Sequence, residues 1–281
     1  MAELLTCYRH PDRETGVSCS ECGRGICPDC MTFSPVGIRC PDHSGQPRGA
    51  ARVVQNVQRG SASRPGIVTT TLIAINVGIY LLQLAGGASF NGNSGWIYEH
   101  GALYGPLVAD GDWHRLITAA FLHYGPIHLG MNMLALWWIG RPLESYLGPV
   151  RYLLVYLVSG LAGSAGALIM NPNAVTVGAS GAIFGILGAA IVLERQGAYV
   201  LGGSAISLLV VNLAFTFAVP GISIGGHLGG AVGGALCILA LSRFGKGSAV
   251  HGRIDLVSVL SIAAVGLLSV GLAYWKVKGY A

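Results

Sequence analysis

The stretches Gly178-Ala179-Ser180-Gly181 and Gly226-His227-Leu228-Gly229-Gly230 each place one reactive side chain in Gly-rich, apolar sequence. A histidine inside hydrocarbon is costly, so His227 is by default a candidate functional residue. A serine beside a histidine base is an activated nucleophile. If Ser180 and His227 lie on neighbouring helices, the pair indicates proteolysis within a membrane.

The composition supports a location in the membrane. Of the 281 residues, 52% are hydrophobic and 10% are charged, and the mean hydropathy is +0.59. A soluble domain has about 25% charged residues, so this chain cannot cover a surface that faces water. The net charge of +5 does not indicate a nucleic-acid partner, because the Lys and Arg residues gather before residue 66 or lie between apolar runs. The opening Met1-Ala2-Glu3 leads into a polar stretch, so we expect no signal peptide.

The chain divides into parts of different composition. Residues 1–45 hold all the cysteines except Cys237, and residues 46–65 are rich in Gly, Ser, Arg and Pro, which is typical of a flexible linker. We expect a six-helix core over 66–245 and a seventh transmembrane helix with a short tail over 246–281. The prediction is an all-α polytopic membrane protein preceded by a small metal-binding domain. The apolar spans run at about 67–85, 127–140, 152–170, 180–193, 199–219, 226–242 and 256–275, and several are shorter than the roughly 20 residues that cross a bilayer.

The basic residues predict the orientation of these spans. Cytoplasmic loops carry an excess of Lys and Arg, and with a cytoplasmic N-terminus nearly all basic residues of the chain fall on the cytoplasmic side. Lys276 and Lys278, in the short tail, break this pattern. We therefore expect a multi-pass protein of the plasma (inner) membrane. The residues that set this orientation are Arg48 to Arg64, Arg141, Arg151, Arg195, Arg243, Lys246 and Arg253.

Three polar residues fall at one depth in this arrangement. At about 1.5 Å per helical residue, Ser180, His227 and His128 stand roughly 20–24 Å above the cytoplasmic boundary. The hydrocarbon core is about 30 Å thick, so all three lie below the outer surface. Irregular backbone at such a depth is tolerated where it lines a water-filled cavity. We therefore expect a polar cavity that opens to the outside.

His128 and Asn132 are four residues apart, so they project from one helix face. Both can donate hydrogen bonds, and the Ser180 backbone N–H at a helix N-terminus is a third donor. Acyl transfer needs such donors aimed at the developing oxyanion. The alternative for Asn132 is a hydrogen bond between helices, and His123 fits a structural or interfacial role better than a catalytic one.

Glycines lie near both reactive residues at helical spacing. Small residues let membrane helices approach closely, and close approach is what a Ser–His hydrogen bond of about 2.6–3.2 Å requires. The alternative is that the glycines only pack helices and that His227 caps one of them. The glycines concerned are Gly181, Gly185 and Gly188 after Ser180, and Gly226, Gly230 and Gly234 around His227.

The order of these motifs resembles the rhomboid family of intramembrane serine proteases over about residues 66–275. The resemblance rests on Trp113-His114-Arg115, His128 with Asn132, Gly178-Ala179-Ser180-Gly181, and Gly226-His227 with Gly230 and Gly234. It implies a Ser–His dyad without an acidic third member, with Ser180 as nucleophile and His227 as general base. It also implies an oxyanion hole of His128, Asn132 and the Ser180 amide, a structural role for Trp113 and Arg115, and six core helices plus a seventh. Phe184 departs from the family pattern, because well-studied bacterial members have a tyrosine whose ring supports the histidine.

Two other classes of function are weighed against this one. A Gly-x-Ser-Gly string also suggests an α/β-hydrolase, but that fold needs a strand–turn–helix context and an acid before the histidine. The acid available between Ser180 and His227 is Glu194, at the membrane boundary. A non-catalytic rhomboid-like protein that binds clients, or a small transporter, remains the alternative. The first hypothesis is an endopeptidase that cuts transmembrane protein substrates and needs no cofactor for its chemistry.

Residues 1–45 contain four pairs of cysteine or histidine at the spacing of metal ligands. The pairs are Cys7-x2-His10, Cys19-x2-Cys22, Cys27-x2-Cys30 and Cys40-x2-His43. Eight ligands suit two tetrahedral zinc ions, whereas disulfides are disfavoured in a reducing cytoplasm. The spacing resembles a B-box-type zinc finger, a kind of module that usually binds proteins, so a cytoplasmic protein partner is expected. This resemblance implies Cys7, His10, Cys27 and Cys30 on one ion and Cys19, Cys22, Cys40 and His43 on the other.

Overall fold

The structure is a computed structural model, and it describes residues 5–34, 37–44, 66–90, 94–242 and 256–280. The chain forms two compact units, Met1–Ser63 and Arg64–Ala281, which we describe separately. The expected linker at 46–65 lies outside the described residues, as do 246–255 at the start of the expected last segment.

The N-terminal unit contains two short antiparallel hairpins. Strands β1 (Leu5–Cys7) and β2 (His10–Thr15) form one, and β3 (Thr32–Ser34) and β4 (Gly37–Arg39) form the other. The core of this unit consists of five buried cysteines and Ile26. So few apolar side chains cannot stabilise a domain of this size without additional links.

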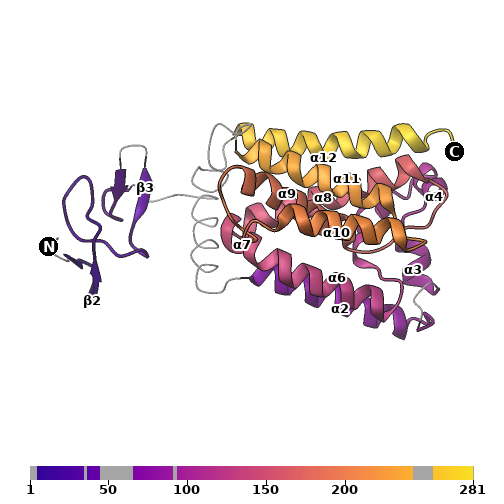
Figure 1. The fold of residues 1–281 in the computed structure, drawn as a ribbon, viewed down its shortest axis with the longest axis horizontal. Coiled ribbons are helices and arrows are strands. Elements are labelled where there is room, and N and C mark those ends of the chain that lie inside the picture. The colour runs from indigo at the N-terminus through magenta and orange to yellow at the C-terminus, as the bar shows by residue number, and fades with distance from the viewer. Residues whose placement is uncertain (1–4, 35–36, 45–65, 91–93, 243–255, 281) are drawn as a thin grey trace. The chain divides into compact units, whose positions relative to one another are not determined.

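The regular elements of the second unit are all helices within its described residues, apart from an isolated β-bridge between Leu103 and Thr176, as the predicted fold class requires (Figure 1). Four of its helices, α2, α8, α11 and α12, are long and apolar enough to cross a membrane, and α10 is a shorter apolar helix. Each expected apolar span has a helical counterpart. The elements in chain order are α2 (Ile67–Ala85), α3 (Trp96–Gly101), α4 (Gly105–Ala109), α5 (Arg115–Thr118), η1 (Ala119–Phe121), α6 (Pro126–Ala135), η2 (Leu136–Gly140), α7 (Arg141–Leu147), α8 (Pro149–Met170), α9 (Ser180–Arg195), α10 (Ala205–Ala218), α11 (Ile224–Leu241) and α12 (Leu256–Val277).

The start of α10 differs from the expected span of 199–219. The helix begins at Ala205, because the preceding residues form turns in which Gly202 and Gly203 have φ angles of 65° and 83°. The Glu194 carboxylate accepts hydrogen bonds from three backbone N–H groups of this segment, at 3.0, 3.0 and 3.2 Å. A carboxylate that binds backbone N–H groups stabilises the turn over a continued helix.

Arg115 organises the long segment between α2 and α6. The residue is 3% exposed, and its side chain donates hydrogen bonds of 2.8 Å to the carbonyl oxygens of Glu99 and Ala102. It also forms an ion pair with Asp112 at 2.9 Å. A buried guanidinium with these partners links α3 to α5, so the geometry agrees with a structural role.

Glycines allow α9 and α11 to pack with their backbones in contact. A Cβ atom on Gly230 would overlap the carbonyl oxygen of Gly181, and one on Gly234 would overlap that of Gly185. Small residues at a helix crossing produce this close approach in membranes.

Helices α6, α9 and α11 begin at the end of the helical unit where α3 and α4 lie (Figure 1). His128, Ser180 and His227 all fall in the first turns of these helices. The fold therefore places the three polar residues at one end of the bundle, as the depth argument predicts.

Candidate active site

Ser180 is the first residue of α9 and is half-buried. The chain reaches it through Gly178, whose φ of 121° suits glycine, and through the fully buried Ala179. The Gly178 N–H donates to the Ala119 carbonyl at 2.9 Å, which attaches this turn to η1. Because Ser180 begins the helix, its backbone N–H is left free of intrahelical partners.

His227 lies in the first turn of α11 and is 6% exposed. Ser223 caps this helix by accepting a 3.1 Å hydrogen bond from the Gly226 N–H. The imidazole stacks on the Phe184 ring, with centroids 3.9 Å apart and planes inclined by 13°. Its Nδ1 atom lies 2.7 Å from the Thr216 hydroxyl of α10.

The neighbours of Ser180 and His227 bring the two residues to the same place. A Cβ on Gly181 would lie 3.4 Å from the Gly226 carbonyl oxygen, and Phe184, one turn after Ser180, stacks on His227. Within the described part of the chain no hydrogen bond joins the serine to the histidine. Catalytic hydrogen bonds are often long before substrate binds.

His128 and Asn132 converge beside the turn that leads to the serine. A Cβ on Gly178 would lie 2.8 Å from His128 Nε2 and 3.4 Å from Asn132 Nδ2. His128 Nδ1 accepts the Tyr124 backbone N–H at 3.3 Å, so the ring proton belongs on Nε2 and this atom donates. Asn132 Nδ2 is a buried donor without a partner among the described residues. Two side-chain donors therefore lie beside the turn that leads to Ser180.

His123 is fully buried, and its ring lies 5.2 Å from that of His128. Its backbone N–H donates to the Gln83 side chain of α2 at 3.2 Å. These contacts place His123 next to His128 and to α2, and its two ring nitrogens have no hydrogen-bond partner among the described residues.

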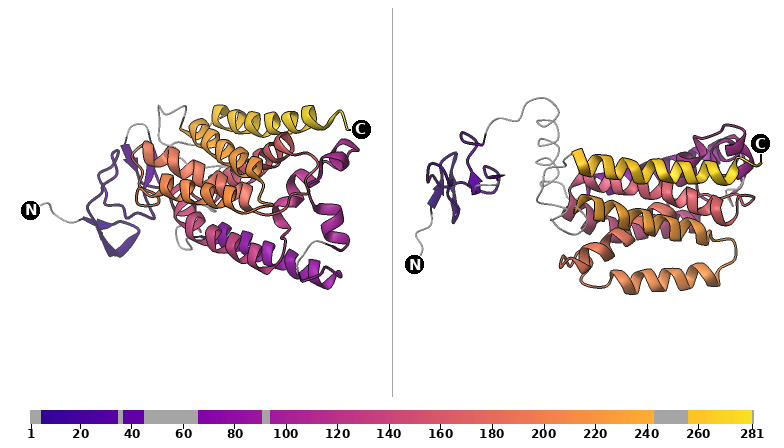
Figure 2. Two further views of the ribbon diagram at one scale, coloured as in Figure 1. Left: turned by 45° about the vertical axis from the view of Figure 1, so that its right-hand side comes forward. Right: turned by 90° about the horizontal axis from the view of Figure 1, so that it is seen from above.

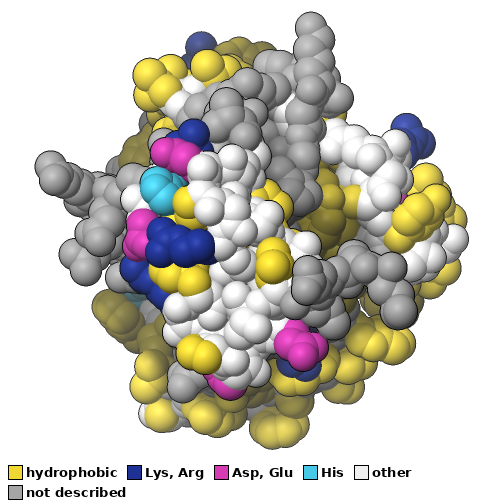
Figure 3. All heavy atoms as spheres, turned by 90° about the vertical axis from the view of Figure 1, so that its left-hand side faces the viewer, with side chains coloured by type: hydrophobic (Ala, Val, Ile, Leu, Met, Phe, Trp, Pro, Cys, Tyr) yellow, Lys and Arg dark blue, Asp and Glu magenta, His cyan; other side chains and the backbone are white. Residues whose placement is uncertain are grey.

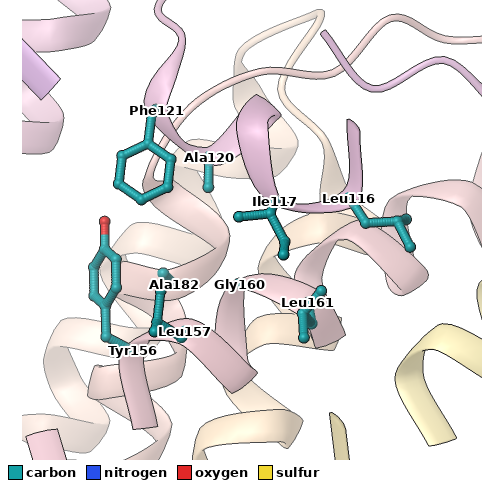
Figure 4. Close-up of a pocket in the computed structure, with 9 residues that line it drawn as sticks. All are labelled: Leu116, Ile117, Ala120, Phe121, Tyr156, Leu157, Gly160, Leu161 and Ala182. Atoms are coloured by element: carbon teal, nitrogen blue, oxygen red, sulfur yellow. The ribbon is translucent and has the colours of Figure 1, made fainter. Parts of the chain in front are cut away.

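An apolar cavity of about 270 Å³ lies beside this region (Figure 4). Ala182, two residues after Ser180, lines it, and Phe121 and Tyr156 face each other at one end. Ser180 and His227 do not line it. The cavity is therefore a neighbour of the candidate site rather than part of it.

The N-terminal unit brings the eight Cys and His ligands together as two groups. Within each group the ligand atoms all lie within 4.8 Å of one another. In the first, His10 Nδ1 lies 3.3, 3.4 and 3.7 Å from its three sulfur neighbours. In the second, His43 Nδ1 lies 3.2 Å from the Cys40 sulfur. All seven cysteines of the chain are free of disulfide bonds. The groups are Cys7, His10, Cys27 and Cys30, and Cys19, Cys22, Cys40 and His43.

The thiols in these groups have pKa values that are shifted in both directions. Burial raises the pKa of the Cys7 thiol, but backbone N–H groups, chiefly that of Cys27, bring this pKa down to about 6. The Cys19 thiol behaves in the same way, with a pKa of about 6. Burial raises the pKa of Cys30 to about 12. Each group therefore offers a thiolate, the form that binds metal, at neutral pH.

Charged residues surround these groups on the surface of the N-terminal unit. Asp42 forms ion pairs with Arg9 at 3.0 Å and with Arg24 at 2.9 Å. Basic and acidic side chains lie side by side in the space-filling view (Figure 3). The face seen in Figure 3 therefore presents charges of both signs.

Thr216 is the site residue that the sequence analysis missed. It lies in an apolar helix and is 2% exposed. Its spacing of four from Asn212 was the available signal, since it puts two polar residues on one face of an otherwise apolar helix.

The fold and this arrangement define a multi-pass helical membrane protein with a candidate serine–histidine site near one end of its bundle. The Rhomboid domain family model matches residues 110–244. The chain is 39% identical to rhomboid protease GluP of Bacillus subtilis over 198 residues, which are 69% of this chain and 38% of GluP. It is 38% identical to YdcA of the same organism over 134 residues, 46% of this chain and 67% of YdcA. It is also 37% identical to RHOMBOID-like protein 7 of Arabidopsis thaliana over 150 residues, 51% of this chain and 48% of that protein.

The chain belongs to the rhomboid family of intramembrane proteases. It spans between about two fifths and two thirds of the length of these three relatives.

Proposed function

We propose that this chain is an intramembrane serine endopeptidase that cuts transmembrane segments of membrane proteins, with Ser180 as nucleophile and His227 as base. The observation that carries the proposal is that two side-chain donors, on His128 and Asn132, lie against the backbone turn before Ser180, next to a buried histidine. A helix-packing role alone would not require the unpartnered Asn132 donor to be buried there.

The chemistry follows from these positions. Ser180 Oγ attacks the scissile carbonyl carbon and its proton passes to His227 Nε2. The carbonyl oxygen becomes an oxyanion that accepts from His128, Asn132 and the Ser180 N–H. The C–N bond then breaks as the proton moves to the leaving amine nitrogen. A water molecule attacks the resulting ester, which frees the new carboxyl end and returns a proton to Ser180 Oγ.

We also propose that the N-terminal unit holds two zinc ions. Ligands about 2.0–2.3 Å from a tetrahedral zinc lie about 3.5–3.8 Å from one another, and the observed 3.2–3.9 Å separations surround these values. Zinc would stabilise the fold and take no part in cleavage. We place the zinc domain at 1–45 on the cytoplasmic side, a linker at 46–65, the catalytic core at 66–245 and a last helix with its tail at 246–281, in the inner plasma membrane. A cytoplasmic protein is the partner that such a domain would bind.

The test is labelling of the purified full chain in detergent with a fluorophosphonate, together with cleavage of a transmembrane substrate in proteoliposomes. The wild type should be labelled and active, and Ser180→Ala should lose both properties. Ser269→Ala is the matched control, because that hydroxyl only bonds to the Val265 carbonyl within α12. An unlabelled, inactive wild type, or an active Ser180→Ala variant, would favour a client-binding protein without this chemistry.

A further inference from the structure

Thr216 is a buried polar residue on a helix that is otherwise little buried. In α10 only Ala205 and Thr216 are buried, and Thr216 is 2% exposed. Helix α10 lies at the outer edge of the bundle when the molecule is seen from above (Figure 2). The Thr216 side chain is thus the point at which this edge helix reaches the candidate site.

The Thr216 hydroxyl makes two short contacts. Its oxygen lies 2.7 Å from the Asn212 carbonyl oxygen, one turn earlier in α10, and 2.7 Å from His227 Nδ1. Both distances are those of hydrogen bonds, so each contact needs one proton between its two atoms.

These two contacts determine which ring nitrogen of His227 carries the proton. A carbonyl oxygen only accepts, so the single hydroxyl proton must lie toward Asn212. The proton in the second contact must then come from His227 Nδ1, which donates to the hydroxyl oxygen. With the proton on Nδ1, neutral His227 has an unprotonated Nε2.

We infer that Thr216 is a positioning residue that holds His227 in the tautomer able to take the proton of Ser180. This inference rests on the proposed function. A general base must have a free nitrogen facing its nucleophile, and the bond made by the other nitrogen sets the tautomer. The same hydroxyl oxygen continues to accept from Nδ1 when His227 becomes an imidazolium.

Phe184 and Thr216 constrain the imidazole in different ways. Stacking on Phe184 at 3.9 Å fixes the plane of the ring, but a phenyl ring cannot distinguish one ring nitrogen from the other. The hydrogen bond to Thr216 supplies this distinction. It also does so without an ionised group, which would be costly at this depth in a membrane.

His128 has the opposite tautomer for an analogous reason. Its Nδ1 accepts from the Tyr124 N–H, which leaves the proton on Nε2. One histidine is therefore set as a donor and the other as an acceptor, each through its Nδ1 atom. An oxyanion donor and a general base need these opposite states.

The experiment compares Thr216→Val, which keeps the shape but removes the hydroxyl, with Thr216→Ser, which keeps the hydroxyl. In proteoliposomes, Thr216→Val should lower kcat by about 10- to 100-fold, because only part of the general-base contribution is lost, while KM changes by less than about 3-fold. The rate of fluorophosphonate labelling should fall in parallel. Thr216→Ser should recover most of both rates.

Thr71→Val is the matched control. Thr71 is also a helical threonine whose hydroxyl bonds to the carbonyl four residues earlier, at 2.8 Å, but it is exposed and has no catalytic neighbour. If Thr216→Val is recovered unfolded, Thr216→Ala and Thr216→Ser form the informative pair, with thermal unfolding measured for each.

Two results would overturn the inference while leaving the proposed function intact. One is a wild type that is labelled at Ser180 together with a Thr216→Val variant that cleaves the substrate at the same rate as this wild type. The other is a Thr216→Ser variant whose cleavage rate and thermal stability are reduced as much as those of Thr216→Val. This result would assign Thr216 to helix packing. A wild type that neither labels nor cleaves would remove the proposed function and this inference together.

Discussion

The two units of this chain obtain their stability in opposite ways. The N-terminal unit has a core of buried cysteines and one isoleucine, so we expect its fold to depend on the zinc ions proposed above. The helical unit has backbones in contact at Gly181 with Gly230 and at Gly185 with Gly234, so its fold depends on side chains being absent. We therefore expect different treatments to unfold the two units, so that each unit can be destabilised while the other stays folded.

Removal of metal should have the largest effect, and only on the N-terminal unit. Structural zinc contributes about 10–16 kcal/mol of apparent binding free energy, so a strong chelator should unfold residues 1–45. Elemental analysis of the full chain should give two zinc ions before treatment, and limited proteolysis should then cut this unit while substrate cleavage stays within about 2-fold.

Cys27→Ser and Cys237→Ser form the matched pair for this prediction. Cys27 belongs to a ligand group, and Cys237, which is buried in α11, belongs to neither group. Only Cys27→Ser should reduce the zinc content. A zinc-free preparation with three disulfides would contradict both the metal assignment and the cytoplasmic location.

Loss of an oxyanion donor should be the next largest effect and should leave both folds intact. Asn132→Ala should lower kcat by about 10²- to 10³-fold, or about 2.7–4 kcal/mol, with KM close to its original value. His128→Ala should cost more, because the Tyr124 N–H would also lose its acceptor. Zinc content and thermal unfolding should match the wild type.

Asn173→Ala is the control for the Asn132 measurement, since Asn173 lies exposed in the turn before α9. A large rise in KM with unchanged kcat for Asn132→Ala would instead place this residue in substrate binding or helix packing.

A single methyl group at the α9–α11 crossing should have the smallest of the three effects, confined to the helical unit. Gly230→Ala would overlap the Gly181 carbonyl oxygen, and overpacking of this kind typically costs about 1–3 kcal/mol. Thermal unfolding in detergent should show a lower midpoint for the helical unit and unchanged metal content.

Gly271→Ala on α12 is the control, because a Cβ there meets no atom within 4 Å. Equal stability of the two variants would mean that the close crossing is not what holds α9 to α11.

Much of the helical fold could be predicted because its signal is local. Apolar runs gave every long helix, and Gly-rich turns marked where α9 and α11 begin near Ser180 and His227. The start of α10 was wrong by several residues, because Glu194 binds the backbone N–H groups of the turn before it. The composition of 199–204 does not reveal that interaction.

The candidate site was predictable to the extent that its residues are unusual in hydrocarbon. His128, Asn132, Ser180 and His227 stand out for that reason. Thr216 does not, because a threonine can satisfy its hydroxyl within its own helix, as Thr71 does. Its contact with His227 arises only when α10 and α11 pack, so the four-residue spacing from Asn212 marks a polar face of α10 but does not indicate what that face meets.

The sparse burial of α10 has a consequence for how the state of the candidate site could be detected. Coupling between two sites is reciprocal, so if the position of α10 sets the state of His227, then an occupied active site should in turn hold α10. Hydrogen–deuterium exchange over Ala205–Ala218 should slow after Ser180 is acylated by an inhibitor that leaves His227 protonated, and Thr216→Val should abolish that slowing. The exchange rate of α10 would then report the state of the active site without any measurement on the substrate.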